Sequence, residues 1–169
     1  YSSTSNITIL SYMNIFLLDK DPKIAAQYHC DKHVVKMILE SAQMLCSAYQ
    51  RHFGEDKELY KIAFPKHPMT VWVGDSLTNY LWLLNLLNNL LIEYNHRYEK
   101  VHQTKKIHLK LLDKIDNITQ IKDKGFTEPP LCMPDEYKTD NFVISYRKYY
   151  IGEKKKFAKY TNREEPSWL

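Results

Sequence analysis

The longest stretch of helical periodicity in the chain spans residues 69–100, and it limits the fold more than any other feature. Leucines recur there at spacings of three and four residues and surround most of the circumference of the predicted helix. A surface helix carries one apolar stripe, whereas a helix that is apolar on most sides is buried. The sequence therefore predicts a long central helix that other parts of the chain cover.

One polar stripe remains on this predicted helix, and it consists of Asp75, Asn79, Trp82, Asn89, Glu93 and Arg97. Buried amide and carboxyl groups need hydrogen-bond partners, because each unpaired group costs about 1–3 kcal/mol. We therefore expect this stripe to line a cleft, with Asn79 and Glu93 facing another principal helix. Simple exposure to solvent is the alternative, and it suits Asn85 and Asn88 better.

The composition fits a helical protein with few tight turns. The 169 residues include only 4 Gly against 13 Tyr, and 44% of the sequence is hydrophobic. A chain of this length buries one core and is short for two domains. We predict an all-α fold in which residues 13–169 form a single compact domain of four to five principal helices around the long central helix. Residues 1–12 carry no charge and are interpreted as an extension or tag.

Further predicted helices span residues 22–28, 31–52, 105–115 and 141–150. Asp21 is placed to cap the first of them, Gly54 ends the second, and Gly152 is a possible break after the last. Residues 13–18 form either an extended lead-in, which we favour, or a buried β segment. Residues 123–135, with three prolines and a glycine, predict a long irregular loop.

Charge and cysteine content limit the environment of the protein. The formal net charge of +4 permits an anionic partner without requiring one. Three cysteines without a Cys-x-x-Cys pair argue against a disulfide framework and favour a reducing compartment. No uncharged apolar run is long enough to cross a bilayer. We expect a cytoplasmic protein without a membrane partner.

The predicted helix at 31–52 has an unusual polar side. Its expected core face is Val35, Ile38, Ala42, Leu45, Cys46 and Tyr49. The opposite side is expected to carry His29, His33, Lys36, Glu40, Gln43 and Ser47. Imidazole, carboxylate, ammonium and amide groups at helical spacing are suited to proton transfer. A solvated face is the alternative interpretation.

Basic and aromatic residues alternate in the closing segment, residues 142–163. The basic residues are Arg147, Lys148, Lys154, Lys155, Lys156, Lys159 and Arg163, against the single acid Glu153. The aromatic residues are Phe142, Tyr146, Tyr149, Tyr150, Phe157 and Tyr160. Cations for phosphates and rings for stacking favour a nucleic-acid surface. Rings in the core and lysines for solubility are the alternative.

Metal ligation is a weaker interpretation of the same residues. His29 and His33 have the spacing of two metal ligands on one helix. Glu93 and His96 form a Glu-x-x-His pair, but a di-iron bundle needs two such pairs and the sequence contains one. We predict no metal and no cofactor, and a single zinc at His29 and His33 stays as an alternative. His67 is an ordinary loop histidine or, with Trp72, lines the mouth of a pocket.

With these residues in hand, the chain resembles short phage and viral proteins grouped with the pyrimidine-dimer DNA glycosylases of the endonuclease V type. The similarity to that viral subgroup covers most of the chain from Met13. The segments that carry it are Met13-Asn14-Ile15-Phe16, Ala25-Ala26-Gln27-Tyr28, Asp31-Lys32-His33 with Lys36-Met37 and Glu40, His67-Pro68 with Trp72, Asn79 with Trp82-Leu83, Glu93-Tyr94 with Arg97-Tyr98, Met133-Pro134-Asp135-Glu136-Tyr137, Tyr146-Arg147 with Tyr149-Tyr150, and Pro166-Ser167-Trp168.

The resemblance implies a DNA-repair hydrolase that cleaves an N-glycosidic bond, with Glu40 as the central carboxylate. The family places a His seven residues before that Glu, which corresponds to His33. It also places Arg immediately before and three residues after the Glu, where this chain has Leu39 and Gln43. The lyase step of the family uses the amine of a small residue exposed after removal of Met, whereas here Asn14 follows Met13. The resemblance therefore implies the glycosylase step and leaves the lyase step open.

Together these arguments predict a DNA-processing enzyme acting on duplex DNA with a damaged or modified base. Its predicted catalytic residues are Glu40, His33 and Glu93. Its predicted substrate-binding residues are His29, Lys36, Gln43, His67, Trp72, Asn79, Trp82, Arg97, Tyr146, Arg147, Lys148, Tyr149 and Tyr150. A hydrolase of free nucleotides or nucleosides that uses the same cleft is one alternative. A non-catalytic DNA-binding module is the other.

Overall fold

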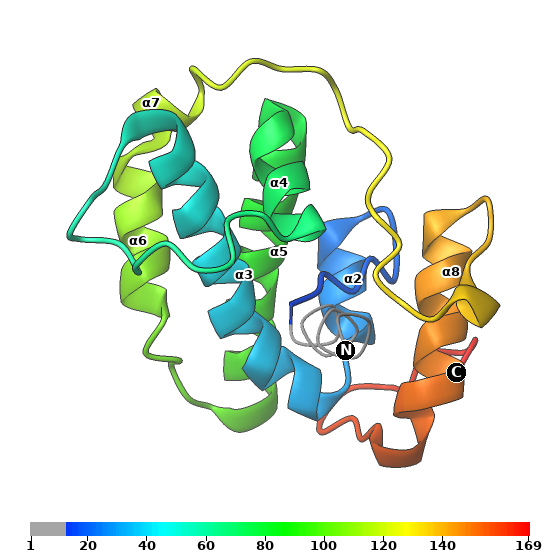
Figure 1. Ribbon diagram of the computed structural model, residues 1–169. Coiled ribbons are helices and arrows are strands. Elements are labelled where there is room, and N and C mark those ends of the chain that lie inside the picture. The colour runs from blue at the N-terminus through cyan, green and yellow to red at the C-terminus, as the bar shows by residue number, and fades with distance from the viewer. Residues whose placement is uncertain (1–12) are drawn as a thin grey trace, which may run out of the picture.

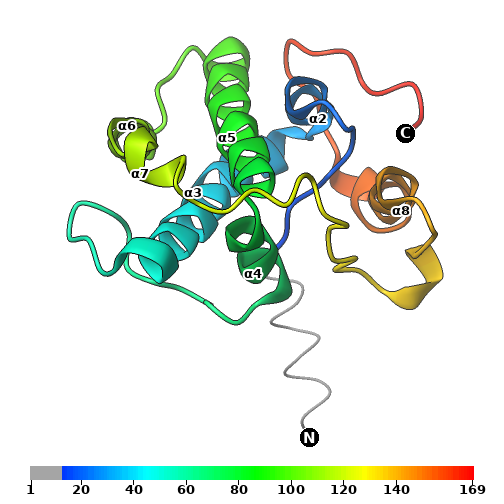
Figure 2. The same ribbon diagram turned by 90° about the horizontal axis from the view of Figure 1, so that it is seen from above.

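Two long helices, α3 (Asp31–Phe53) and α5 (Leu77–Tyr98), lie against each other in the middle of the molecule. The computed structural model in Figures 1 and 2 describes residues 13–169, so the interpretation of residues 1–12 lies outside the described residues. The helix α2 (Pro22–Tyr28) packs on α5, and α4 (Pro68–Asp75) packs on both long helices. All regular elements of residues 13–169 are helical, which confirms the all-α prediction.

The predicted helix at 69–100 is two helices, because the chain is extended at Ser76 (φ −153°, ψ 142°). The Ser76 hydroxyl lies 2.7 Å from the carbonyl oxygen of Gly125, and it accepts the N–H of Lys124 at 2.9 Å. The carboxylate of Asp123 accepts the Thr78 hydroxyl at 2.8 Å, so the distant loop also holds the start of α5. The long helix is buried as predicted, but it begins eight residues later than residue 69 because the loop interrupts it.

The α3 helix buries two sides. Five of its six predicted core residues are buried, and Val35 is the exception at 41% exposure. The core face is rotated toward Val34, Met37 and Ser41, which are also buried. The periodicity misplaced that face because α3 is covered both by helices and by the chain before α2, whose Phe16 stacks on His33.

Residues 13–18 are the predicted extended lead-in, and all six are buried. The Asn14 amide donates to the carbonyl oxygen of Cys132 at 2.9 Å, and Arg147 Nε donates to that of Leu18 at 2.8 Å. These bonds connect the lead-in to α8 (Phe142–Tyr149) and to the chain before it. Figures 1 and 2 show α8 on the opposite side of the long helices from α6 (Lys105–Asp113) and α7 (Ile115–Ile118).

The ends of the shorter elements follow the predicted signals. Asp21 Oδ1 accepts the N–H of Lys23 at 2.8 Å at the start of α2, and Gly54 ends α3 with φ +88°. The predicted helix at 105–115 is divided into α6 and α7 at Lys114. The irregular loop after α7 is confirmed; it crosses above α4 in Figure 1 and includes the short 3₁₀ turn η1 (Asp135–Tyr137) before α8.

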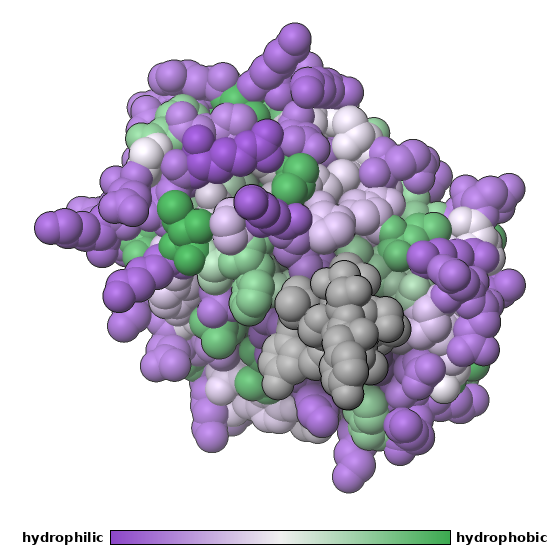
Figure 3. All heavy atoms as spheres, viewed as in Figure 1, coloured by the Kyte–Doolittle hydropathy of each residue, from purple (hydrophilic) through white to green (hydrophobic). Residues whose placement is uncertain are grey.

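After α8 the helical path changes into a π-helical turn, η2 (Tyr150–Lys154), and then a 3₁₀ turn, η3 (Lys155–Phe157). This is the break expected near Gly152. All three cysteines are buried and free. The face in Figure 3 is mainly hydrophilic with scattered apolar residues, and within residues 13–169 every helix is too short or too polar to cross a bilayer.

Gly152 gives a direct test of this chain end. A Cβ at position 152 would overlap the ring of Tyr137, and the Tyr137 hydroxyl already donates to Glu153 at 3.0 Å. We predict that Gly152→Ala lowers the free energy of unfolding by about 1–3 kcal/mol, the usual cost of overpacking. Denaturant unfolding measures this. In a Tyr137→Ala background the same change should cost little, and an equal cost in both backgrounds would contradict the overlap.

Candidate active site

Glu40 is the most unusual carboxyl group of the structure. It lies in the middle of α3 at 7% exposure, and its Oε2 atom is buried with no hydrogen-bond partner among the described residues. Burial raises the pKa of Glu40 to about 7, and the charge of Lys36, one helical turn earlier, opposes this shift. Such a carboxyl group exchanges its proton near neutral pH, as a general acid or base must.

His33 lies two turns before Glu40 and is held from two sides. Its Nδ1 is 2.6 Å from the Tyr150 hydroxyl, and its ring stacks on Phe16 with 4.4 Å between centroids and 9° between planes. Burial and the nearby positive charges lower the pKa of His33 to about 2, and burial raises the pKa of Tyr150 well above its usual value. The imidazole is therefore neutral, and its Nδ1 shares a hydrogen bond with the Tyr150 hydroxyl, which also contacts the Cys30 sulfur at 3.5 Å.

His29 was expected on the same helical face as His33, and the structure corrects this. His29 is the residue after α2 and precedes the start of α3, because the helix breaks at Cys30. Its Nδ1 donates to the carbonyl oxygen of Ala25 at 2.6 Å, and burial lowers its pKa to about 4. Residues 13–169 contain no group of three His, Cys, Asp or Glu side chains placed to hold a metal ion.

Glu93 and Arg97 form a buried ion-pair network. Arg97 donates to Glu93 at 2.9 Å and to Asp31 at 3.0 Å, and Arg163 donates to both Glu93 oxygens at 2.7 and 2.9 Å. Burial opposes ionisation of Glu93, but the hydrogen bonds from Arg163 and Arg97 outweigh it and lower the pKa of Glu93. Glu93 has no part in the raised pKa of Glu40, which is caused by burial.

Asn79, Trp72 and Trp82 were expected to line the cleft, and they instead fix the chain around α5. The Asn79 amide donates to the Trp72 carbonyl oxygen at 2.9 Å and to the Thr127 hydroxyl at 2.8 Å, and its Oδ1 accepts the N–H of Thr127 at 3.0 Å. The indole N–H groups of Trp72 and Trp82 donate to the carbonyl oxygens of Thr127 and Lys20. The predicted need of Asn79 for partners is met by a loop.

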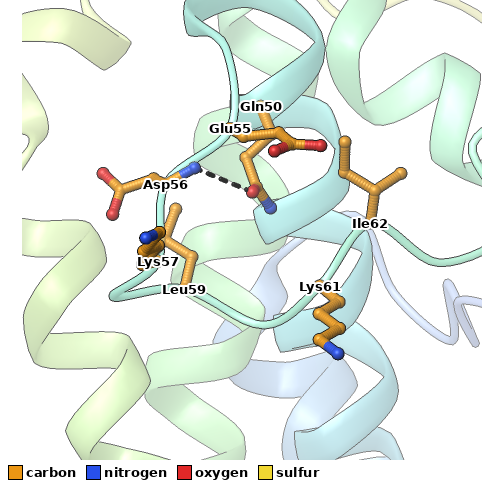
Figure 4. Close-up of a pocket in the computed structure, with 7 residues that line it drawn as sticks. All are labelled: Gln50, Glu55, Asp56, Lys57, Leu59, Lys61 and Ile62. Atoms are coloured by element: carbon orange, nitrogen blue, oxygen red, sulfur yellow. Dashed lines mark hydrogen bonds between the residues drawn. The ribbon is translucent and has the colours of Figure 1, made fainter.

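Of the remaining predicted residues, one caps a helix and three lie at or near the surface. His67 Nδ1 accepts the N–H of Met69 at 3.1 Å, so His67 caps α4. Gln43 is half-buried, and Lys36 and Lys148 are exposed. A hollow of about 570 Å³ lies near the C-terminal end of α3. Figure 4 shows the side chains that line it, Gln50, Glu55, Asp56, Lys57, Leu59, Lys61 and Ile62. That hollow contains none of the predicted site residues.

Three of the six aromatic residues of the closing segment belong to the core, which corrects the expectation that Tyr146, Tyr149 and Tyr150 contact DNA. Tyr146 and Tyr150 are fully buried, and Tyr149 is 7% exposed. The Tyr146 hydroxyl donates to the carbonyl oxygen of Pro130 at 2.8 Å. Arg147, expected to contact DNA, instead pairs with Asp19 at 3.0 Å and lies over the Tyr28 and Trp168 rings.

Several neighbours of His33 were not predicted as site residues. Besides Phe16 they are Cys30, whose backbone N–H donates to the Tyr150 hydroxyl at 3.2 Å, and Phe157, whose ring centroid lies 5.8 Å from that of His33. Tyr150 was predicted, but as a contact to DNA. No local signal joins positions 117 residues apart, as His33 and Tyr150 are.

Comparison of the chain with protein-family models, with curated proteins and with solved structures gave no match. The case for a function therefore depends on the side chains of α3 and their surroundings. Glu40 is the group with free acid–base capacity there. Glu93, by contrast, is committed to two guanidinium groups.

The structural role of Asn79 can be tested by truncation. Asn79→Ala leaves the Trp72 carbonyl and the Thr127 N–H without their partner, so we predict a loss of about 1–3 kcal/mol in the free energy of unfolding. Amide exchange of residues 123–128 should also accelerate. Asn88→Ala, at an exposed position of the same helix, is the control. Equal stability of the two variants would exclude the anchoring role.

The buried carboxyl group of Glu40 predicts a pH-dependent stability. Its pKa is about 7 in the folded chain against the usual 4.5, so the folded state holds a proton that the unfolded state releases between these values. The free energy of unfolding therefore falls as pH rises through this window, by an amount on the order of 3 kcal/mol. Glutamine has no carboxyl proton to release, so the stability of Glu40→Gln does not fall in this window. The variant should therefore be more stable than the parent protein at pH 8 but not at pH 4.

Denaturant unfolding at the two pH values measures the difference. The exposed Glu128→Gln is the control and should follow the parent protein at both. A Glu40→Gln variant whose stability relative to the parent is the same at pH 4 and pH 8 would show that the Glu40 carboxyl titrates normally.

Proposed function

We propose that the protein is a DNA-processing hydrolase that cleaves the N-glycosidic bond of a damaged or modified base, with Glu40 as its acid–base residue. One observation carries the proposal: Glu40 is buried on α3 with an unpartnered oxygen, so the fold does not use its charge. An unpaired buried carboxyl group costs stability, and groups retained at such a cost concentrate in functional sites. The substrate class comes from the family that the sequence resembles.

The proposed reaction needs one carboxyl group that changes its protonation state. The bond between the sugar C1′ and the base nitrogen breaks, and its electron pair leaves with the base. A water oxygen bonds to C1′, and its proton passes to the Glu40 carboxylate. The cationic side chain of Lys36 lies close enough to Glu40 to favour the ionised form that this step requires.

Surface lysines are the groups proposed to hold DNA. Lys148, Lys155, Lys156 and Lys159 are exposed along the closing segment, and Lys32 and Lys36 are exposed on α3. Ammonium groups bind backbone phosphates without reading the base sequence, and they make affinity dependent on salt. The buried tyrosines and the paired Arg147 have no part in this contact.

Glu40→Gln is the decisive variant. The amide keeps the shape of the side chain and cannot take a proton from water, so we predict that base release falls by at least 100-fold while duplex binding is unchanged. The assay uses duplexes that carry a pyrimidine dimer, uracil or an alkylated base, and it measures free base together with alkali-labile sites.

The exposed Glu128→Gln is again the matched control and should retain full activity. Full base release by Glu40→Gln would overturn the catalytic assignment. Hydrolysis of free nucleosides by the parent protein, with no release from any duplex, would support the same carboxyl group acting on a small substrate. Duplex binding without any hydrolysis would support a binding module.

A further inference from the structure

Three buried side-chain atoms on α3 and α4 have no hydrogen-bond partner among the described residues. They are Glu40 Oε2 in the middle of α3, and His67 Nε2 and Thr70 Oγ1 at the start of α4, which packs on α3. The three residues are only 7%, 5% and 3% exposed, so bulk solvent does not supply the missing partners. Unpaired buried polar atoms cost stability, and three of them on two adjoining elements point to a ligand that they share.

The structure fixes which nitrogen of His67 carries the proton. The backbone N–H of Met69 can only donate, and His67 Nδ1 accepts it at 3.1 Å, so Nδ1 is unprotonated. Burial lowers the pKa of His67, so the ring is neutral at pH 7 and its one proton is on Nε2. His67 therefore offers a hydrogen-bond donor at the atom that has no partner. The Thr70 hydroxyl, in the first turn of the same helix, can donate or accept.

The chain that leads into α4 runs along α3 in the direction of Glu40. The Ser47 hydroxyl of α3 accepts the N–H of Ala63 at 2.9 Å and donates to its carbonyl oxygen at 3.1 Å. Three residues earlier, the carbonyl oxygen of Tyr60 accepts the side chain of Gln50 at 2.8 Å, so the segment runs toward the start of α3. Glu40 lies about two helical turns before Ser47 and leaves α3 on nearly the same side. Figure 1 shows this segment crossing α3 just before α4 begins.

The turn at the end of this segment is strained. Phe64 has φ +47°, in the left-handed region that a residue with a bulky side chain rarely adopts. Its carbonyl oxygen accepts the N–H of His67 at 3.1 Å, so the strained residue sets the position of His67. The Phe64 side chain is 51% exposed, so burial of the ring is not what holds this conformation. Backbone strain of this kind concentrates at functional sites, where it orients a side chain.

We propose that Glu40, His67 and Thr70 together hold one water molecule, and that this is the water that attacks the sugar. A buried water makes about three hydrogen bonds to otherwise unpaired polar groups. Here the water accepts from His67 Nε2–H and donates to the Glu40 carboxylate and to the Thr70 hydroxyl oxygen. When the water oxygen bonds to C1′, its proton passes to Glu40, and His67 keeps its own proton and positions the water. The site deepens the proposed function and rests on it for the attack, but water binding is measured without DNA.

The pKa of Glu40 reports the bound water, and carboxyl ¹³C shifts of the full chain, labelled on glutamate and assigned with Glu40→Gln, measure it. A water polarised by His67 Nε2–H favours the ionised carboxylate, so His67→Asn should raise the pKa of Glu40 by about 0.5–1. Asparagine can accept the N–H of Met69 in place of the imidazole, so the helix cap is kept. His102→Asn is the matched control, because His102 Nδ1 accepts the N–H of Thr104 at 3.1 Å in the same way.

Thr70→Val separates a hydroxyl that binds the water from one that binds nothing. Valine has nearly the shape of threonine, so loss of a hydroxyl bonded to the water should lower stability, whereas loss of an unpaired buried hydroxyl should raise it. A crystal structure of the parent protein should show one ordered water within hydrogen-bond reach of Glu40, His67 and Thr70. A gain in stability of Thr70→Val, or an unchanged pKa of Glu40 in His67→Asn, would overturn the site.

Base release distinguishes this site from the proposed function. With the damaged duplexes, His67→Asn should release base about tenfold more slowly or worse, with unchanged duplex binding, and His102→Asn should match the parent protein. A parent protein that shows the bound water and the coupling of His67 to Glu40, but releases no base, would contradict the proposed function and leave the water site standing. Full base release by His67→Asn would contradict the role of the water and leave that of Glu40.

Discussion

The side chain of Arg97 fixes the relative positions of the parts that make up the site. Its guanidinium is buried and donates to Glu93 of α5, to Asp31 at the start of α3 and to the carbonyl oxygen of Gln27 in α2. Two of these acceptors also hold the chain end, through Thr161 and Arg163. Removing one partner of such a buried pair costs about 3–5 kcal/mol, because the remaining charge stays buried. The direction in which α3 presents His33 and Glu40 depends on this network.

Much of the fold could be predicted because it depends on local signals. Leucine spacing indicated the buried α5, and Asp21 and Gly54 marked helix ends that the structure confirms. The break at Ser76 could not be predicted, since the groups that hold it lie about 50 residues away, at Asp123 and Gly125. Val35 was misplaced because α3 is covered on two sides, and a single apolar stripe cannot be read from such a helix.

Prediction of the site was likewise limited by contacts between residues far apart in the sequence. Residue type and spacing singled out His33 and Glu40, whose chemistry is unusual for a helix side. The same criteria also selected Glu93, Asn79 and Arg147. The polar groups of these residues bind partners that lie far away in the sequence, so their role is structural. A structural carboxyl group has a hydrogen-bond or ion-pair partner within the fold, whereas a functional one can lack it. Which of the two applies depends on tertiary contacts that the local sequence does not show. Glu40 is distinguished by an oxygen that no described group reaches.

The buried lead-in has a consequence for synthesis of the protein on the ribosome. Residues 13–18 are made before their partners Cys132, Tyr146 and Arg147, which are more than 110 residues further along the chain. Contacts of such long sequence separation form slowly and cannot form before both ends exist. The nascent chain therefore exposes the apolar residues 13–18 and an uncovered His33 until the segment that carries these partners has been made.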